Sequence, residues 1–412
     1  MPLVQPFRGL RPIADKAIDV VAPPYDVLNT AEARERIKGH PLSFLHISKP
    51  EIDLPEGTDP YADDVYAKGA ENLQKLINDK VLIRDDKACY YVYRLIMGNH
   101  QQTGLVVAAS VADYDTNRIR KHEYTRPDKE DDRVRQIDAL NAQTGPVFLT
   151  YRNNKVVEAI TEKVSKTTPT YDLTADDGVK HTIWVVSDDD DITTLTTTFD
   201  EMECLYIADG HHRSASASRI AASRNKDESG EHTASHNYFL SVIFPDNQMQ
   251  ILDYNRVIKD LNGLSEDELL NKIKDNFSVE SVDALYKPKK RKEFSMYLKG
   301  QWYKLQVNID LIPENDPVGA LDISLLQNNL IEPLLGVSDP RRDKRIDFVG
   351  GIRGLEELEK RVDSGEMQVA FAIFPTSLSQ LMDVADANEV MPPKSTWFEP
   401  KLADGLVSHV LD

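Results

Sequence analysis

The stretch Leu205-Tyr-Ile-Ala-Asp-Gly-His-His-Arg-Ser-Ala-Ser-Ala217 contains the pattern of a strand, a tight turn and the start of a helix. Its short apolar run predicts a buried strand that ends at Asp209-Gly210, and the small residues after Arg213 predict a helix. Such a turn brings free backbone N–H groups and the positive end of the helix dipole to one point. Arg213 and two imidazoles at that point predict an anion site, for which phosphate is the usual ligand.

The composition is that of a globular protein in water. The chain has 412 residues, of which 41% are hydrophobic and 28% charged, a length that suggests two or three domains. It contains no apolar run of the roughly 20 residues that span a bilayer, and its N-terminus lacks a signal-peptide pattern. Cys89 and Cys204 are the only cysteines, which fits a reducing compartment. We therefore expect a cytoplasmic protein with no membrane partner.

The net charge of −19 argues against a nucleic-acid partner, because an acidic surface repels a phosphate backbone. It also makes any local basic cluster more informative, since the background charge cannot explain it.

Short strands and isolated helices alternate irregularly, which favours an α+β fold over a regular series of βαβ units. Residues 59–79 carry apolar side chains at helical spacing, and β-rich runs at 90–97 and 104–111 flank a Gly-Asn-His turn. We expect an N-terminal α+β lobe at 1–262, which carries the phosphate-binding turn, and a smaller C-terminal α/β lobe at 263–412.

A second candidate cluster lies in the charged stretch 118–135. The triplet Lys121-His122-Glu123 directly follows a strand-like segment, and Arg126 comes shortly after it. Cations that neutralise phosphate, together with a carboxylate that orients a hydroxyl group, are what a phosphoryl-transfer site needs. A solvated helix face is the alternative interpretation, and it suits residues 128–135.

Two proline-containing segments could also line the site. Pro23-Pro24 holds Tyr25 and Asp26 in an extended or turn conformation, and Lys394 follows two further prolines. Structural and functional interpretations stay open for both segments. The sequence has no P-loop, no G-x-G-x-x-G, no H-E-x-x-H and no G-x-S-x-G motif, so a nucleotide would bind by an atypical route.

Nearly the whole chain resembles a bacterial family catalogued as a domain of unknown function, number 1015. The matching blocks are Pro6–Pro12, Ala22–Val27, Lys121–Glu123 with Thr125-Arg126, Asp128–Arg133, Ala208–Arg213 and Met391–Phe398.

Asp209-Gly-His-His-Arg213 is similar to the phosphate-binding turn of the ParB/sulfiredoxin-like fold, in particular of its free-serine kinases. The resemblance implies a mixed-sheet nucleotide-binding core, phosphate contacts at Gly210, His211, His212 and Arg213, and a metal or substrate contact at Asp209. Sulfiredoxins have a reactive cysteine where this chain has His211, which argues against sulfinic-acid reduction.

The resemblance and the charged cluster together predict a phosphotransferase. We expect a nucleotide-dependent kinase that converts a small hydroxylated metabolite, with free L-serine the best guess and O-phosphoserine the product. The donor would be ATP, or else ADP or CTP, with Mg²⁺. Glu123 would act as the base and Asp209 as a second catalytic carboxylate, with Lys121 and Arg126 offsetting charge and His122, Tyr25, Asp26 and Lys394 as further substrate contacts.

Two other functions stay open at this stage. One is a metal-dependent phosphohydrolase with Asp209, His211 and His212 as metal ligands. The other is a nucleotide sensor without catalysis. The sequence also leaves the oligomeric state open, a homodimer included.

Overall fold

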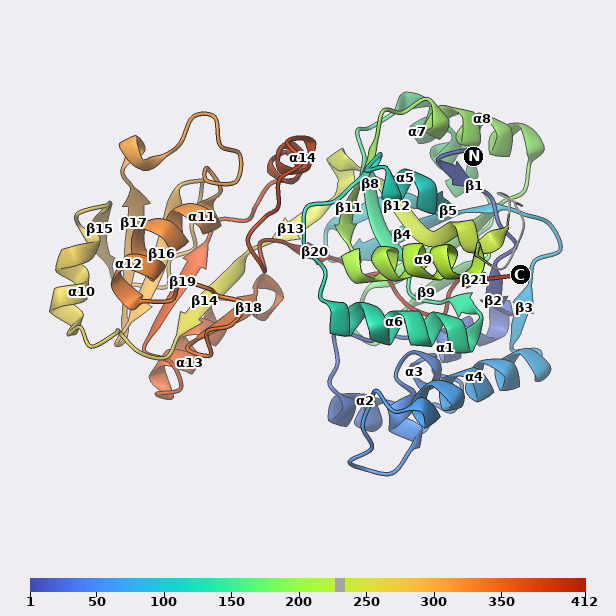
Figure 1. Ribbon diagram of the computed structural model, residues 1–412, viewed down its shortest axis with the longest axis horizontal. Helices are drawn as coiled ribbons and strands as arrows, with labels where there is room; N and C mark the ends of the chain where they lie inside the picture. The colour runs from blue at the N-terminus through green and yellow to red at the C-terminus, as the bar shows by residue number, and fades with distance from the viewer. Residues whose placement is uncertain (227–233) are drawn as a thin grey trace. The chain divides into compact units, whose positions relative to one another are not determined.

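The computed structural model describes residues 1–226 and 234–412 and divides into two units; Figure 1 colours the chain by residue number. Unit 1 comprises 1–249 and 400–412, and unit 2 comprises 250–399. The expected boundary at residue 262 is therefore revised, because the last segment of the chain returns to unit 1. There Ser408 forms a β-bridge with Leu10, a long-range pairing that local sequence patterns do not reveal.

Unit 1 is built on a nine-stranded mixed sheet. Its strand order is β6-β11-β8-β12-β5-β4-β10-β9, and β1 also pairs with β5. The pairs β11–β6 and β12–β8 are parallel, whereas the other neighbours are antiparallel. The strands are β1 (Val4–Gln5), β4 (Tyr90–Met97), β5 (His100–Ser110), β6 (Ile119–Arg120), β8 (Val147–Tyr151), β9 (Tyr171–Thr174), β10 (Lys180–Val186), β11 (Leu205–Asp209) and β12 (Tyr238–Pro245).

Helices and two small sheets complete unit 1. The predicted hairpin is present as β4 and β5, with Gly98 in the left-handed region at the turn. The small sheets pair β2 (Leu10–Pro12) with β3 (Leu82–Arg84) and β7 (Ala142–Gln143) with β21 (His409–Val410). The helices are α1 (Ala17–Val20), α2 (Thr30–Arg36), α3 (Leu45–Ser48), α4 (Asp63–Asn78), α5 (Val111–Asp115), α6 (Pro127–Leu140), α7 (Lys155–Ser165), α8 (Asp189–Asp200) and α9 (His211–Arg224).

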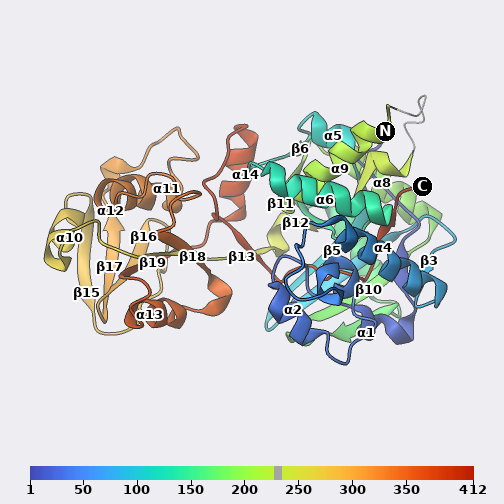
Figure 2. The same cartoon turned by 60° about the horizontal axis from the view of Figure 1, so that its bottom comes forward.

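Helices α6 and α9 run side by side across the sheet in both views (Figures 1 and 2). Small residues permit this close packing, and the Ser216 hydroxyl of α9 donates to the Glu130 carbonyl of α6 at 3.1 Å. On its other side α6 contacts α4, where the Tyr66 hydroxyl donates to Asp132 at 2.8 Å. The alanines at 215, 217 and 221 bury the inner face of α9 in the main core of the unit. The start of α9 is thereby fixed between the sheet and α6.

Unit 2 has a six-stranded sheet in the order β15-β17-β16-β19-β14-β18, and all its neighbouring strands are antiparallel. A separate two-stranded sheet pairs β13 with β20. The strands are β13 (Gln250–Leu252), β14 (Tyr254–Ile258), β15 (Phe277–Val282), β16 (Glu293–Leu298), β17 (Gln301–Val307), β18 (Ile346–Gly350), β19 (Val369–Ile373) and β20 (Trp397–Glu399). The helices are α10 (Glu266–Ile273), α11 (Asp322–Leu326), α12 (Glu332–Leu335), α13 (Glu356–Asp363) and α14 (Leu378–Asp386).

The chain is thus a mixed α/β protein with one large mixed sheet and several smaller sheets. Within the described ranges, no helix combines the length and the apolar character that a membrane crossing requires.

Candidate functional site

The predicted strand–turn–helix is present in unit 1. Strand β11 ends at Asp209, Gly210 turns the chain, and α9 begins at His211. Gly210 has φ +100°, and a Cβ atom there would lie 3.1 Å from the Nε and Cζ atoms of Arg213. Glycine is therefore required both by the backbone conformation and by the packing of the guanidinium group. No side chain caps this helix start, so its first N–H groups remain available to a ligand.

Arg213 is buried at the first turn of α9. Its side chain is 13% exposed, and Nη2 lies 3.7 Å from Asp209 Oδ1. Nη1 donates to the carbonyl oxygen of Pro146. Burial disfavours the charged form, but the negative charges of Asp209 and Asp26 outweigh it and keep the pKa of Arg213 above its ordinary value. The site therefore holds a permanent positive charge that is desolvated and fixed in place.

Lys401 was not among the residues that the sequence singled out, yet it contacts the turn. Its ammonium group lies 3.0 Å from Asp209 Oδ2. Burial alone would raise the pKa of Asp209, but Lys401 and then Arg213 hold it well below the ordinary value of a carboxyl group. Asp209 is thus a carboxylate placed between two cations, which suits it to position them and not to exchange a proton near neutral pH.

The two histidines of the turn hold the neighbouring segment 121–126. His211 Nε2 accepts the backbone N–H of His122 at 3.4 Å, and His212 Nε2 accepts that of Arg126 at 3.0 Å. An imidazole that accepts through Nε2 carries its proton on Nδ1 when neutral, so we assign that tautomer to both rings. Both histidines of the turn are therefore bound to nearby backbone groups.

Both turn histidines are uncharged near neutral pH. Burial is the main reason that the pKa of His211 is well below its ordinary value, and the adjacent His122 lowers it further. His122 packs edge-on against His211, with ring centroids 4.5 Å apart, and burial lowers its pKa to about 4. Burial also lowers the pKa of His212. Any phosphate contact of these rings would therefore be a neutral hydrogen bond from Nδ1.

Glu123 lies beside this histidine cluster. One of its carboxylate oxygens is 3.9 Å from His211 Nδ1, the atom that carries the proton, and its side chain is 46% exposed. The carboxylate is thus next to the start of α9 and partly exposed.

Lys121 and Arg126 do not direct their charges at the turn. The Lys121 ammonium group lies 4.0 Å from the centroid of the Tyr114 ring, and burial lowers its pKa. The Arg126 side chain is 69% exposed, and its Nη2 atom lies 2.8 Å from Asp128. In this conformation Arg126 contributes its backbone N–H, to His212, and its guanidinium group belongs to the surface.

Of the other predicted contacts, Tyr25 and Asp26 are near the turn. The Asp26 carboxylate and the Tyr25 hydroxyl group both raise the pKa of Arg213. Tyr25 also lines a cavity that Arg213 lines. Lys394 lies in unit 2, has a left-handed backbone with φ +57°, and accepts through its carbonyl oxygen from Arg256 Nη2 at 2.9 Å.

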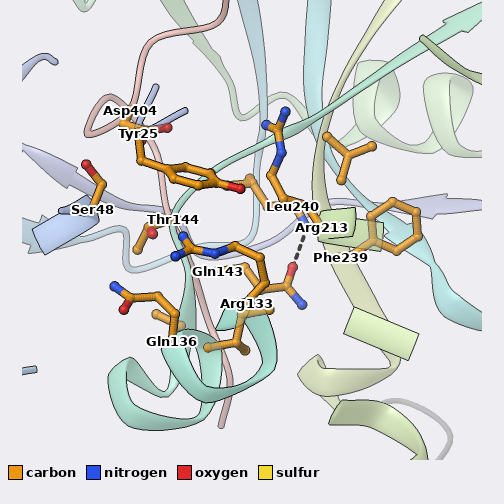
Figure 3. Close-up of a pocket in the computed structure, with 14 residues that line it drawn as sticks. Tyr25, Ser48, Arg133, Gln136, Gln143, Thr144, Arg213, Phe239, Leu240 and Asp404 are labelled. Carbon is orange, nitrogen blue, oxygen red and sulfur yellow. Dashed lines mark hydrogen bonds between the residues drawn. The ribbon is translucent and has the colours of Figure 1, made fainter. Parts of the chain in front are cut away.

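The cavity beside the turn was not predicted from the sequence (Figure 3). It encloses about 480 Å³ of space free of protein atoms, part of it open to solvent. Arg133 stacks over the Tyr25 ring at 4.0 Å, and the buried Asp404 lies opposite. Arg133 could have been identified from its spacing, because it shares a helix face with the buried residues 136, 137 and 140. Asp404 stands between the apolar residues Leu402-Ala403 and Leu406-Val407, and an acid in such a run is the corresponding signal.

The residues of the turn do not fit a metal site. Asp209 faces two cations, and Nε2 of His211 and of His212 each accepts a backbone hydrogen bond. Among residues 1–226 and 234–412, no group of three or more histidine, cysteine or acidic side chains is arranged to hold a metal ion. The expectation of Asp209 as a metal ligand therefore has no geometric support, and the three-ligand site of a metal-dependent phosphohydrolase is absent from this part of the chain.

Comparison with protein families matches residues 4–324 to the family described as "Protein of unknown function (DUF1015)". The chain belongs to this family. No curated protein matches the sequence.

Several solved structures are similar at low identity. They include "Free serine kinase in complex with AMP" (12% identity, TM-score 0.37, 74% of this chain and 92% of that chain). "SbnI with C-terminal truncation from Staphylococcus aureus" has 10% identity and a TM-score of 0.39, over 72% of this chain and 84% of that chain. A conserved hypothetical protein from Pyrococcus furiosus has 13% identity and a TM-score of 0.35, over 73% and 94%. At TM-scores below 0.5, these similarities establish no common activity.

The buried histidines predict an acid-sensitive fold. His122 has a folded-state pKa of about 4, below the value near 6.5 of an unfolded chain, so the unfolded state binds the proton first on acidification. Between these pH values His122 should make the free energy of unfolding fall by about 1.4 kcal/mol for each unit of decreasing pH. Denaturant unfolding at several pH values measures this slope.

The variant His122→Gln should flatten that slope, and the exposed His40→Gln provides the control. Parent and His122→Gln curves that run parallel from pH 7 to about 4 would contradict the burial of a neutral imidazole at this position.

Proposed function

We propose that this member of the DUF1015 family is a nucleotide-dependent kinase, and that the turn at 209–213 binds the phosphates of the nucleotide. The acceptor in this proposal is the hydroxyl group of a small metabolite, with free L-serine the best guess and ATP the expected donor. A ParB/sulfiredoxin-like core is part of the same proposal.

The observation that carries the proposal is the buried Arg213 at an uncapped helix start. Backbone N–H groups at the N-terminus of α9 and the positive end of its dipole face the same region as the guanidinium group of Arg213. Lys401 adds a second cation beside Asp209. Phosphate matches both the N–H groups and the planar fork of the guanidinium.

Glu123 is the residue best placed to accept the proton of the acceptor hydroxyl. It lies beside the first turn of α9, and the Nδ1–H of His211 faces one of its oxygens. His211 and His212 would fix the segment that carries Glu123, through their bonds to the backbone at 122 and 126. The catalytic carboxylate and the phosphate turn would then be held in register by these two hydrogen bonds, which supports catalysis by orientation.

Mg²⁺ would have to enter with the nucleotide. This ion usually keeps several waters and is held by substrate phosphates with one or two carboxylates. Asp209 is already paired with Lys401 and faces Arg213. Arginine, lysine and backbone N–H groups are therefore the protein's own contribution to phosphate binding in this proposal.

Replacing Arg213 tests the phosphate site. Arg213→Lys keeps a positive charge but loses the planar fork of donors, so we expect ATP binding to weaken about tenfold or more. Isothermal titration calorimetry with ATP measures the change. Arg219→Lys is the matched control, because Arg219 lies on the same helix and is paired with Asp131 at 2.7 Å on the surface. Equal ATP affinity in both variants and the parent would rule out the turn as the phosphate site.

Replacing Glu123 separates a kinase from a sensor. Glu123→Gln should lower kcat by about 10²–10⁴-fold while leaving ATP affinity within a small factor of the parent, because a general base acts on the acceptor and not on the phosphates. The assay is phosphorus NMR of ATP, Mg²⁺ and a panel of small hydroxylated metabolites. Asp138→Asn, which changes an exposed carboxylate of the neighbouring helix α6, is the control.

A phosphoserine signal with the parent protein would identify both the reaction class and the acceptor. Tight ATP binding without a phosphorylated product from any acceptor would instead make the protein a nucleotide sensor, and the kinase proposal would be abandoned.

A further inference from the structure

The cavity of Figure 3 contains two buried polar atoms without a protein partner. Asp404 Oδ1 and Ser48 Oγ accept or donate no hydrogen bond within the described chain, although Asp404 is 2% and Ser48 5% exposed. Leaving such an atom unpaired costs about 1–3 kcal/mol, so buried polar atoms almost always have a partner. Both residues line the same cavity. Their missing partner is therefore a molecule inside it.

The cavity wall also carries a hydrogen-bond donor with a fixed charge. Arg133 Nε and Nη2 donate to Asp132 at 3.0 and 2.8 Å, and the guanidinium plane covers the Tyr25 ring. Within residues 1–226 and 234–412, Nη1 of Arg133 has no protein acceptor. In Figure 3 the Tyr25 ring extends from the side of Asp404 toward Arg213, with the Arg133 guanidinium beside the ring. A cationic donor and an acidic acceptor thus share one small space.

This pairing discriminates among ligand classes. A free phosphate would bind the arginines but would be repelled by an ionised Asp404, and a metal ion would be repelled by Arg133 and Arg213. A ligand that carries an ammonium group and a carboxylate close together satisfies both ends. The enclosed part of the cavity is small, which restricts the ligand to a compact head group.

We propose that this cavity binds the head group of a free α-amino acid, with its ammonium group donating to Asp404 and its carboxylate accepting from Arg133. Ser48 Oγ is the further partner within reach of the head group. The role of this amino acid as phosphate acceptor rests on the proposed kinase function, but its binding does not.

Arg213 connects the cavity to the turn. A Cβ atom on Gly145 would lie 3.4 Å from the Arg213 stem and 3.7 Å from Asp404 Oδ1, so these two side chains flank the same glycine. The guanidinium end of Arg213 packs instead against Gly210. An amino acid held at Asp404 would therefore extend its side chain along Arg213 toward the phosphate turn, as an acceptor hydroxyl requires.

The protonation of Asp404 makes this assignment testable through pH. Burial, opposed by Arg213 and Arg133 and assisted by the negative charge of Asp26, raises its pKa to about 7. The backbone N–H of Tyr25, which also faces the carboxyl group, favours the charged form. Because an ammonium ligand needs the ionised carboxylate, affinity should increase as the pH rises from 6 to 8, a range in which the ligand itself stays protonated.

The test is calorimetric binding of L-serine to the full chain without nucleotide, followed by the other amino acids. Ethanolamine lacks the carboxylate and glycerate lacks the ammonium group, so each should bind about tenfold or more weakly than serine. Asp404→Asn should weaken serine binding by a similar factor and remove its pH dependence. Asp138→Asn is the control, because Asp138 lies on the exposed side of α6, 3.4 Å from Arg224.

Ser48→Ala guards against a folding defect in Asp404→Asn, since it removes a cavity atom without removing a charge. It should weaken serine binding by a few-fold while leaving the melting temperature near that of the parent. Unchanged serine affinity in folded Asp404→Asn would overturn the proposal. So would a parent protein that binds no amino acid at millimolar concentration, which would mean that the cavity holds water only.

This experiment separates the two proposals. Amino-acid binding that depends on Asp404, without phosphate transfer from ATP, would refute the kinase function and leave the cavity assignment intact. Transfer to a hydroxylated acceptor that has no amino group, with Asp404→Asn fully active, would support the kinase and refute the cavity assignment.

Discussion

The burial of one guanidinium group organises the functional half of this protein. Arg213 is fixed by the Pro146 carbonyl and by Asp209, and its guanidinium lies so close to Gly210 that no larger residue fits there. A buried cation is tolerated only where carboxylates compensate it, which explains why Asp209, Asp26 and Asp404 surround it. The turn at 209–213 and the cavity therefore share one residue, Arg213.

The histidines of the turn have a different role from the one that their chemistry first suggests. Consecutive imidazoles beside an arginine resemble direct phosphate or metal ligands, yet His211 and His212 are neutral and bind the backbone at 122 and 126. They connect the loop before α6 to the start of α9. Since Glu123 lies in that loop, these rings determine the distance between a carboxylate and the anion site. In the proposed mechanism the two rings position the loop that carries Glu123.

The sequence predicted the local structure of the site well and its long-range contacts poorly. Strand β11, the glycine turn and helix α9 followed from an apolar run, a left-handed glycine and small residues, all of which act over a few positions. Lys401 and Asp404 lie almost 200 residues from the turn in sequence, and they reach it because the C-terminal segment pairs with the N-terminal strand β2 and bridges to Ala22. Such pairings leave no periodic signal, so neither the return of residues 400–412 to unit 1 nor the cavity was predicted.

The central claim is that the start of α9 binds nucleotide phosphates. A crystal structure with a non-hydrolysable ATP analogue tests it most directly. The phosphate oxygens should accept hydrogen bonds from backbone N–H groups of residues 211–213 and from Arg213, with the γ-phosphate directed toward Glu123. A nucleotide bound elsewhere, with the turn in contact with solvent alone, would contradict the claim.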